Sequence, residues 1–216
     1  MTAYAATVEQ LTSGSAEDFL SSLGGGHGTA GAALVHGAVV PRAVTRLPAQ
    51  RLPFLPDEVT GIPFLSHDAA VTGRRLGIGE LRCYQLFDDN SPVLAALNSR
   101  LPHDAGAGGP AGADQLRSVA DAVVAGRSAY QIFMVESVDG DRAEIALARV
   151  PSTYALTAAV LAATVRALDD LPPGGHRAAD VLAPQLVVDC VRAAGGQVWT
   201  LDGTLSAYAD VEAGVI

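Results

Sequence analysis

The residue with the most chemistry to offer is His27, which lies in the glycine-rich stretch GGGHGTAG at residues 24–31. An imidazole titrates near neutral pH, and flanking glycines let a ligand approach without steric hindrance. We therefore predict that His27 acts as a general acid or base. We predict that Gly26, Gly28 and Thr29 bind substrate beside it, with Thr29 offering its hydroxyl and backbone N–H at a helix start. The alternative is that His27 and Thr29 only cap that helix.

Two tyrosines are candidate partners for this histidine. Tyr84 lies in the alternating segment at residues 80–87, and Tyr154 lies at the start of a long apolar helix. A phenol can donate a proton or a hydrogen bond to a group that becomes charged during a reaction. We predict catalytic roles for Tyr84 and Tyr154, and packing in the core is the alternative for each.

A second group of polar residues surrounds the expected helix at residues 67–75. His67 and Asp68 begin this helix and Arg74 lies near its end, so we predict that these three residues bind substrate. Adjacent helical residues do not face each other, and His67 and Asp68 therefore do not form a dyad by position alone. The alternatives are an Asp68 that only complements the helix dipole and an Arg74 that is only solvated, rather than one that clamps a carboxylate.

Several chemistries lack the residues that they require. All 14 basic residues are arginines, which excludes a lysine Schiff base and a P-loop lysine. No grouping of His, Cys and Asp has zinc spacing, and no G-x-S-x-G motif is present, so we predict neither a metal site nor a serine hydrolase. Cys83 and Cys190 are expected to pack as small apolar side chains.

The composition is typical of a globular protein with a large core. Hydrophobic residues make up 49% of the 216 residues and charged residues 17%. The net charge of −9 argues against nucleic acid or an anionic membrane as a partner. No apolar run approaches the roughly 20 residues that span a bilayer, and the N-terminus does not resemble a secretory signal. We expect a cytoplasmic protein whose partner is a small-molecule substrate.

The hydrophobic pattern predicts an α+β fold, with an antiparallel or mixed β-sheet and helices packed on one face. The hairpin is the clearest element, because Asp139-Gly140-Asp141 separates two alternating runs. The expected strands are 39–47, 80–87, 129–138, 142–150 and 197–201, and the expected helices are 16–23, 29–36, 67–75, 91–100, 113–125, 153–171 and 179–194. Residues 48–63 are expected to be loop and edge strand, and residues 103–112 a flexible surface loop. We expect one domain over residues 1–201 and a loosely ordered tail over 202–216, with the pairs Asp88-Asp89 and Asp169-Asp170 solvated at turns.

The stretch at residues 26–31 matches G-x-G-x-x-G, the dinucleotide-binding fingerprint. The preceding residues AEDFLSSL resemble a helix rather than a buried strand, and no acidic residue follows about 20 positions later. The match is therefore weak evidence for a nucleotide site.

Four stretches, taken in order, resemble the saccharopine dehydrogenase-like reductases. They are the glycine-rich turn ending in Gly28-Thr29, SHDAAVTGRRLGI at 66–78, STYALT at 152–157, and LPPGG at 171–175 followed by VLAP at 181–184. The resemblance covers roughly residues 20–196 and corresponds to the C-terminal substrate domain of that family. No Rossmann unit precedes the glycine-rich turn, so the resemblance implies a substrate domain without its nucleotide half, and a homodimer formed through the sheet.

Three functions follow from these expectations. The first is a small-metabolite enzyme that performs cofactor-independent acid–base chemistry such as isomerisation, cyclisation or elimination. The second is the substrate-binding subunit of a split reductase, in which a separate Rossmann chain supplies NAD(P). The third is a non-catalytic module for ligand binding or dimerisation.

Overall fold

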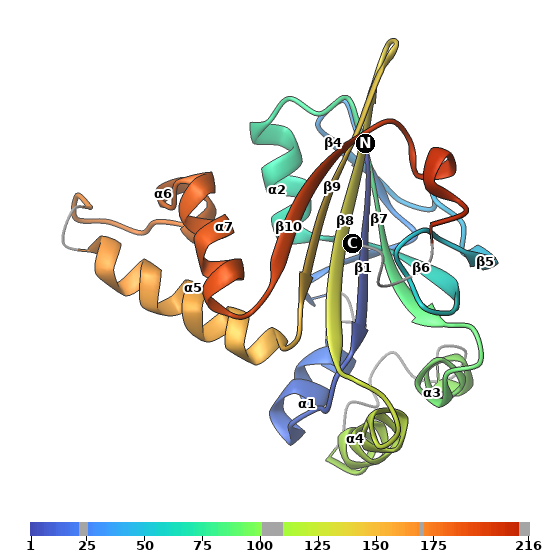
Figure 1. The fold of residues 1–216 in the computed structure, drawn as a ribbon. Helices are drawn as coiled ribbons and strands as arrows, with labels where there is room; N and C mark the ends of the chain where they lie inside the picture. The colour runs from blue at the N-terminus through green and yellow to red at the C-terminus, as the bar shows by residue number, and fades with distance from the viewer. Residues whose placement is uncertain (22–25, 101–109, 169–170, 212–216) are drawn as a thin grey trace.

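The chain folds as a mixed β-sheet packed with helices, which confirms the predicted α+β class. The computed structural model describes residues 1–21, 26–100, 110–168 and 171–211. Figure 1 views the sheet nearly edge-on, with helices on one side of it and at its lower end. The C-terminal segment lies on the other side of the sheet.

The centre of the sheet is built from strands that are far apart in the chain. These are β1 (Thr2–Val8), β7 (Glu80–Asp88), β8 (Tyr130–Asp139), β9 (Arg142–Val150) and β10 (Gln197–Asp202). Their spatial order is β10-β9-β8-β1-β7. β1 pairs in parallel with β7 and antiparallel with β8, so the first strand of the chain is internal to the sheet.

The sheet divides beyond β7. The start of β7 pairs with β3, where Leu34 lies opposite Leu81, while its second half pairs with β6, from Tyr84 opposite Pro63 to Asp88 opposite Val59. β6 also pairs with β2 and β5, and β3 pairs with β4. The bounds are β2 Gly28–Ala30, β3 Ala33–Val35, β4 Ala38–Val40, β5 Leu47–Arg51 and β6 Glu58–Ser66.

The helices form two groups (Figure 1). At the lower end of the sheet are α1 (Ser13–Ser21), α3 (Pro92–Arg100) and α4 (Pro110–Val124). On one side of the sheet are α2 (His67–Arg75), α5 (Thr153–Ala167), α6 (Ala178–Val181) and α7 (Pro184–Ala193). The longest of the described helices have 15 residues, and none of them could cross a membrane.

The main core lies on the face of the sheet opposite α2. Alternation along the strands directs Tyr84 and Leu86 to this face together with Ile132 and Met134, and all four are at most 8% exposed. Smaller clusters fill the space under α2 and between α1 and α4. The C-terminal 3-10 helix η3 (Leu205–Tyr208) covers the main core with the buried Leu205, so residues 202–211 pack on the sheet rather than forming a loose tail.

Several predicted elements are confirmed. The hairpin of β8 and β9 turns at Gly140, whose φ of 56° suits glycine. α2 begins after Ser66, whose hydroxyl accepts a hydrogen bond from the N–H of Ala69 at 3.0 Å. β7, α3, α4 and β10 lie within a few residues of their predicted bounds. Most of the predicted loop at 103–112 and the pair Asp169-Asp170 fall outside the described residues.

The N-terminal half differs most from the prediction. The helix expected at 29–36 is wrong, because these residues form β2 and β3 with a turn at Gly31, where φ is +68°. The strand expected at 39–47 is interrupted between β4 and β5. The stretch at 48–63, expected to be loop and edge strand, contains most of β5 and the first part of β6. β1 was not predicted at all.

The C-terminal helices are shorter than predicted. α5 ends at Ala167, and the helix expected at 179–194 is divided into α6 and α7. Pro184 occupies the first turn of α7, where a missing N–H costs no helical hydrogen bond.

Candidate functional site

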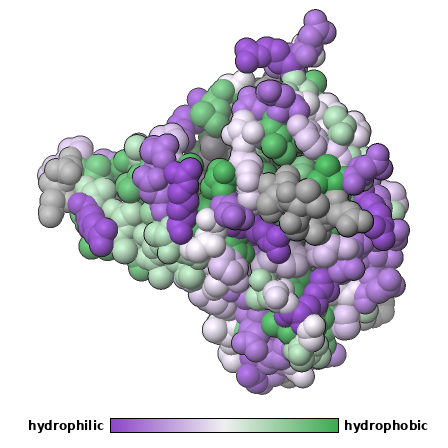
Figure 2. Space-filling model, in the orientation of Figure 1, coloured by the Kyte–Doolittle hydropathy of each residue, from purple (hydrophilic) through white to green (hydrophobic). Residues whose placement is uncertain are grey.

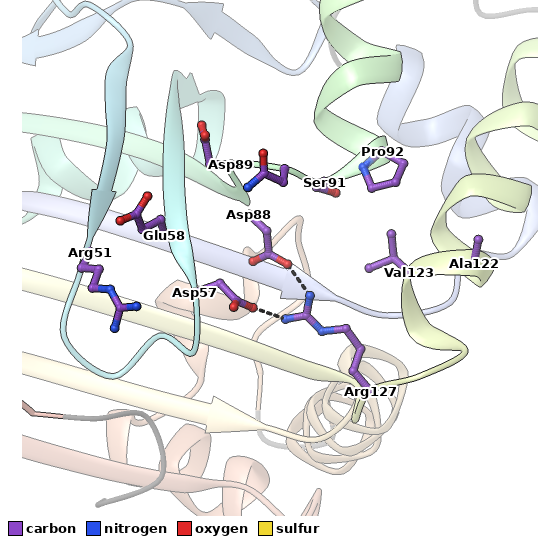
Figure 3. A pocket seen from close by; sticks show the side chains of 11 residues that line it. Arg51, Asp57, Glu58, Asp88, Asp89, Ser91, Pro92, Ala122, Val123 and Arg127 are labelled. Carbon is purple, nitrogen blue, oxygen red and sulfur yellow. Dashed lines mark hydrogen bonds and ion pairs between the residues drawn. The ribbon is translucent and has the colours of Figure 1, made fainter.

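The end of β7 borders a cavity of about 530 Å³ between the β5–β6 hairpin, the start of α3 and the end of α4 (Figure 3). Its walls are rich in charged side chains. Four are acidic and two are basic: Asp57, Glu58, Asp88, Asp89, Arg51 and Arg127. None of these residues was predicted as part of a site.

Arg127 joins two walls of the cavity. Its guanidinium donates to the carboxylate of Asp88 at 2.6 Å and to that of Asp57 at 2.9 Å. The side chain of Asp88 is only 13% exposed and that of Arg127 is 30% exposed. Burial lowers the pKa of Arg127, but the charge and hydrogen bond of Asp88, together with Tyr130 and Asp57, raise the pKa overall. The expectation that Asp88 is solvated is therefore wrong.

The turn after β7 fixes the second acidic residue. The hydroxyl of Thr60 on β6 donates to Asp89 at 2.6 Å, and the N–H of Ser91 donates to the carbonyl of Asp88 at 2.9 Å. The hydroxyl of Ser91 in turn accepts from the N–H of Val93 at 3.2 Å, in the first turn of α3. Asp89 is thus held by its neighbours and is only half-exposed, while its second carboxylate oxygen makes no hydrogen bond to the described residues.

Glu58 and Arg51 complete the charged lining. They lie opposite each other in the pairing of β5 with β6, and both are exposed. Figure 3 shows them on the far side of the hairpin from Arg127. Neither side chain forms a hydrogen bond or ion pair with any described residue, so both are available to a ligand.

Tyr130 lies beneath the charged pair, 5% exposed at the start of β8. Burial raises the pKa of its phenol, and the carboxylates of Asp88 and Asp57 raise it further. A second cavity, of about 540 Å³, shares Arg51 and Asp57 with the first and extends towards Asp210. Among the described residues, no group of His, Cys, Asp and Glu is arranged to hold a metal ion.

The structure places His27 beside His67, at the other end of β6. The carbonyl of His27 accepts the backbone N–H of His67 at 2.9 Å, and both side chains are exposed. Gly28 and Thr29 form β2 here, so Thr29 does not begin a helix. The G-x-G-x-x-G match likewise lies across a strand and a turn, without the helix that a fingerprint requires.

The remaining polar candidates lie on α2. Asp68 is exposed in the first turn, where a carboxylate complements the helix dipole. Arg74 donates through Nε to the carbonyl of Gly37 at 2.7 Å. Its neighbour Arg75 forms an ion pair with Asp180 of α6, so the carboxylate that it binds belongs to this chain.

The two tyrosines are placed far from that group. Tyr84 is 8% exposed in the main core and stacks on Tyr4, with ring centroids 5.7 Å apart, and burial raises its pKa. The hydroxyl of Tyr154 donates to the carbonyl of Gln10 and accepts the N–H of Thr12, both at 3.1 Å. Neither of the two cavities described above is lined by His27, Tyr84 or Tyr154.

Sequence reasoning missed the cavity because its charged residues come from three separate segments. Arg127 is 39 residues from Asp88 and 70 from Asp57. The acidic pair at 88–89 was visible in the sequence, but the arginine that binds Asp88 was not marked by any local pattern.

We compared the chain with known protein families, proteins and structures. No protein-family model, curated protein or solved structure matches this chain. None of these comparisons links the chain to the saccharopine dehydrogenase-like reductases, and that resemblance stays a prediction.

Proposed function

We propose that this chain binds a small polar molecule that carries a positively charged amine, in the cavity at the end of β7. The observation that supports this most is the balance of charge in the lining, where four carboxylates face two guanidiniums. Arg127 is already engaged by Asp57 and Asp88, so the carboxylates of Glu58 and Asp89 are left to receive the ligand. The proposal belongs to the third predicted class, a ligand-binding module.

Arg51 narrows the class of ligand. Its guanidinium lies on the same cavity wall as Glu58 and can bind a carboxylate or phosphate with two parallel hydrogen bonds. A ligand with an ammonium group and an anionic group, such as an amino acid with a basic side chain, would therefore satisfy both signs of charge. The volume of about 530 Å³ lies in the range of roughly 300–1,000 Å³ typical of small-molecule sites.

The acid–base enzyme first expected from His27, Tyr84 and Tyr154 receives less support from the geometry. The backbone of His27 is bonded to His67 at an exposed sheet edge, whereas Tyr84 is enclosed in the main core. Tyr154 is held by the loop before α1. Any catalysis at the cavity would use a carboxylate such as Glu58 as the base.

Calorimetric titration of the purified chain tests the proposal. The probes are L-ornithine, which has ammonium and carboxylate groups, the diamine putrescine, and succinate, which is only anionic. We expect ornithine to bind most tightly, putrescine more weakly and succinate not at all. The proposal would be refuted if both amines failed to bind at about 10 mM. A dissociation constant above this concentration corresponds to a binding free energy weaker than about 3 kcal/mol.

Variants locate the binding. Glu58→Gln and Asp89→Asn each remove one negative charge, and the amide oxygen that the second variant introduces could still accept the hydroxyl of Thr60. We expect each to weaken ornithine binding about tenfold, equivalent to about 1.4 kcal/mol. Glu144→Gln, on the exposed face of β9, is the matched control and should leave binding unchanged. Equal affinity in all three variants would place the ligand elsewhere.

A further inference from the structure

Helix α5 and its C-cap residue Leu168 carry an apolar seam that the described structure leaves largely uncovered, although the loop before α1 holds the hydroxyl of Tyr154. The members of the seam are Tyr154, Leu161, Val165 and Leu168, which are 42%, 61%, 55% and 56% exposed. Ala158, between the first two, is exposed as well. The steps between neighbours alternate four, three, four and three residues, which places all five on one side of a helix. This is the spacing of a helix that packs against another helix.

The seam faces away from the body of the protein. α5 packs against α7, where the thiol of Cys190 lies 3.6 Å from the carbonyl of Ala159, and α7 packs against β9 and β10. α5 therefore reaches the sheet through α7 along most of its length. Figure 1 shows the two helices projecting sideways from the sheet. Figure 2 shows apolar, green atoms mainly along the lower part of this projection, with hydrophilic, purple side chains above them.

The seam lacks the negative charge that would keep two copies of the chain apart. Two copies with a net charge of −9 each repel one another over most of their surfaces. α5 has no acidic residue and only one charged residue, Arg166 in its last turn. The seam is thus a region where two copies can meet without bringing like charges together.

We propose that two copies of the chain dimerise through α5, with the two helices antiparallel and crossing at Leu161. The spacing of the seam is symmetric about this residue, since Tyr154 lies seven positions before it and Leu168 seven after it. In a two-fold pair, Leu161 meets its own copy and Tyr154 meets Leu168 of the other chain. In the antiparallel arrangement, the positive N-terminal end of each helix lies beside the negative C-terminal end of the other, which is favourable.

The same arrangement brings opposite charges together. Arg166 of one copy approaches the N-terminal end of the other copy's α5, where the carboxylate of Glu9 accepts the N–H of Thr153 at 3.0 Å. The sheet does not enter this interface, in contrast to the homodimer that the family resemblance implies. The proposal is independent of the amine-binding cavity, which involves none of the residues of α5.

The size of the seam sets the expected affinity. A 15-residue helix is about 22 Å long, so α5 alone buries less than the roughly 800 Å² per partner of a standard interface. We therefore expect a reversible dimer with a dissociation constant in the region of about 10 μM.

Sedimentation equilibrium of the whole chain tests the proposal. The wild-type chain should be monomeric when dilute and dimeric at about 100 μM, above the expected dissociation constant. Leu161→Glu should be monomeric at both concentrations. The matched control is Val138→Glu, which places the same charge at an apolar residue with 56% exposure on β8 and should still dimerise. A wild-type chain that stays monomeric, or a Leu161→Glu variant that dimerises, would overturn the proposal.

Cysteine cross-linking tests the crossing point separately. The antiparallel pair places Leu161 next to its own copy, so Leu161→Cys should form an intermolecular disulfide under mild oxidation. Tyr154→Cys should not, because its two copies would lie at opposite ends of the interface. The wild-type chain, oxidised in the same way, measures any cross-linking through its native thiols, the half-buried Cys83 and the buried Cys190. Cross-linking through position 154 but not 161 would indicate a parallel pair or another interface and reject this one.

Discussion

Arg127 and Asp88 form an ion pair 2.6 Å long that connects the loop after α4 to the end of β7. The same guanidinium reaches Asp57, in the loop between β5 and β6. Three segments that are distant in sequence are thus held together by one side chain, and they are the walls of the charged cavity. Among the described residues that form ion pairs, Asp88 has the least exposed side chain.

Removal of this arginine should destabilise the fold measurably. Arg127→Ala leaves the carboxylate of Asp88 mostly buried without its partner. We expect the free energy of unfolding to fall by about 1–3 kcal/mol, between the values for exposed and buried ion pairs. Urea denaturation of the variant and the wild type measures this loss in the free energy of unfolding. Arg82→Ala is the control, because Arg82 and Glu80 are both about half-exposed and should contribute less than about 0.5 kcal/mol. Equal losses in the two variants would contradict this account.

Stability should decrease in alkali because of Tyr4. Burial raises the pKa of Tyr4 from 10.0 to about 12, and the nearby carboxylate of Glu136 adds to the effect. The folded chain therefore holds this proton more tightly than the unfolded chain. Its contribution to stability is complete below pH 10, the unfolded value, and is lost as the pH rises through about 12.

Urea denaturation between about pH 9 and pH 12 measures this loss as the slope of stability against pH. Tyr4→Phe should reduce the slope, since phenylalanine has no proton to lose. Part of the slope should remain, because burial also raises the pKa values of Tyr84 and Tyr130. A slope that Tyr4→Phe leaves unchanged would argue against the buried environment of Tyr4.

Gly28 should tolerate no side chain. A Cβ at this position would lie 2.5 Å from the carbonyl oxygen of Leu65 and 2.7 Å from the ring of Phe64. We expect Gly28→Ala to lower the free energy of unfolding by about 1–3 kcal/mol, the usual cost of overpacking. Gly26→Ala is the control, because no described atom lies within 4 Å of its added Cβ. Thermal unfolding should separate the two variants clearly, and similar midpoints would count against the close pairing of β2 with β6.

Tyr154 should contribute to stability through its hydroxyl. Tyr154→Phe removes the hydrogen bonds to Gln10 and Thr12, and we expect a loss of about 0.5–1.5 kcal/mol in chemical denaturation. Thr157→Ala, at an exposed position of the same helix, should be neutral or slightly stabilising. A Tyr154→Phe variant as stable as the wild type would remove the structural role that we assign to this residue.

Local patterns in the sequence were sufficient to predict the elements that depend on them. The β8–β9 hairpin follows from its Asp-Gly turn between alternating runs, and α2 follows from Ser66 as a cap. β1 could not be predicted in this way. Its sequence TAYAATV is rich in alanine, and its place between β7 and β8 is determined by partners about 80 and 130 residues away.

The error at residues 29–36 has a similar cause. This segment was expected to be a helix, but the close contact of Gly28 with β6 and the positive φ of Gly31 favour two short strands and a turn. The charged cavity could not be predicted, because it depends on Arg127 meeting Asp57 and Asp88 across the fold.

The central position of β1 also constrains how the protein can be made. β1 is synthesised before its partner β7, which begins 72 positions after Val8, where β1 ends. At 5–20 residues per second this is a delay of roughly 4–14 s. β8 follows later still. β1 therefore has both hydrogen-bonding edges unpaired until β7 is made and one edge unpaired until β8 is made. Sequence-distant pairing of this kind slows folding. Unpaired strand edges of this kind promote association with other strands, and in the finished fold β7 and β8 cover both edges of β1.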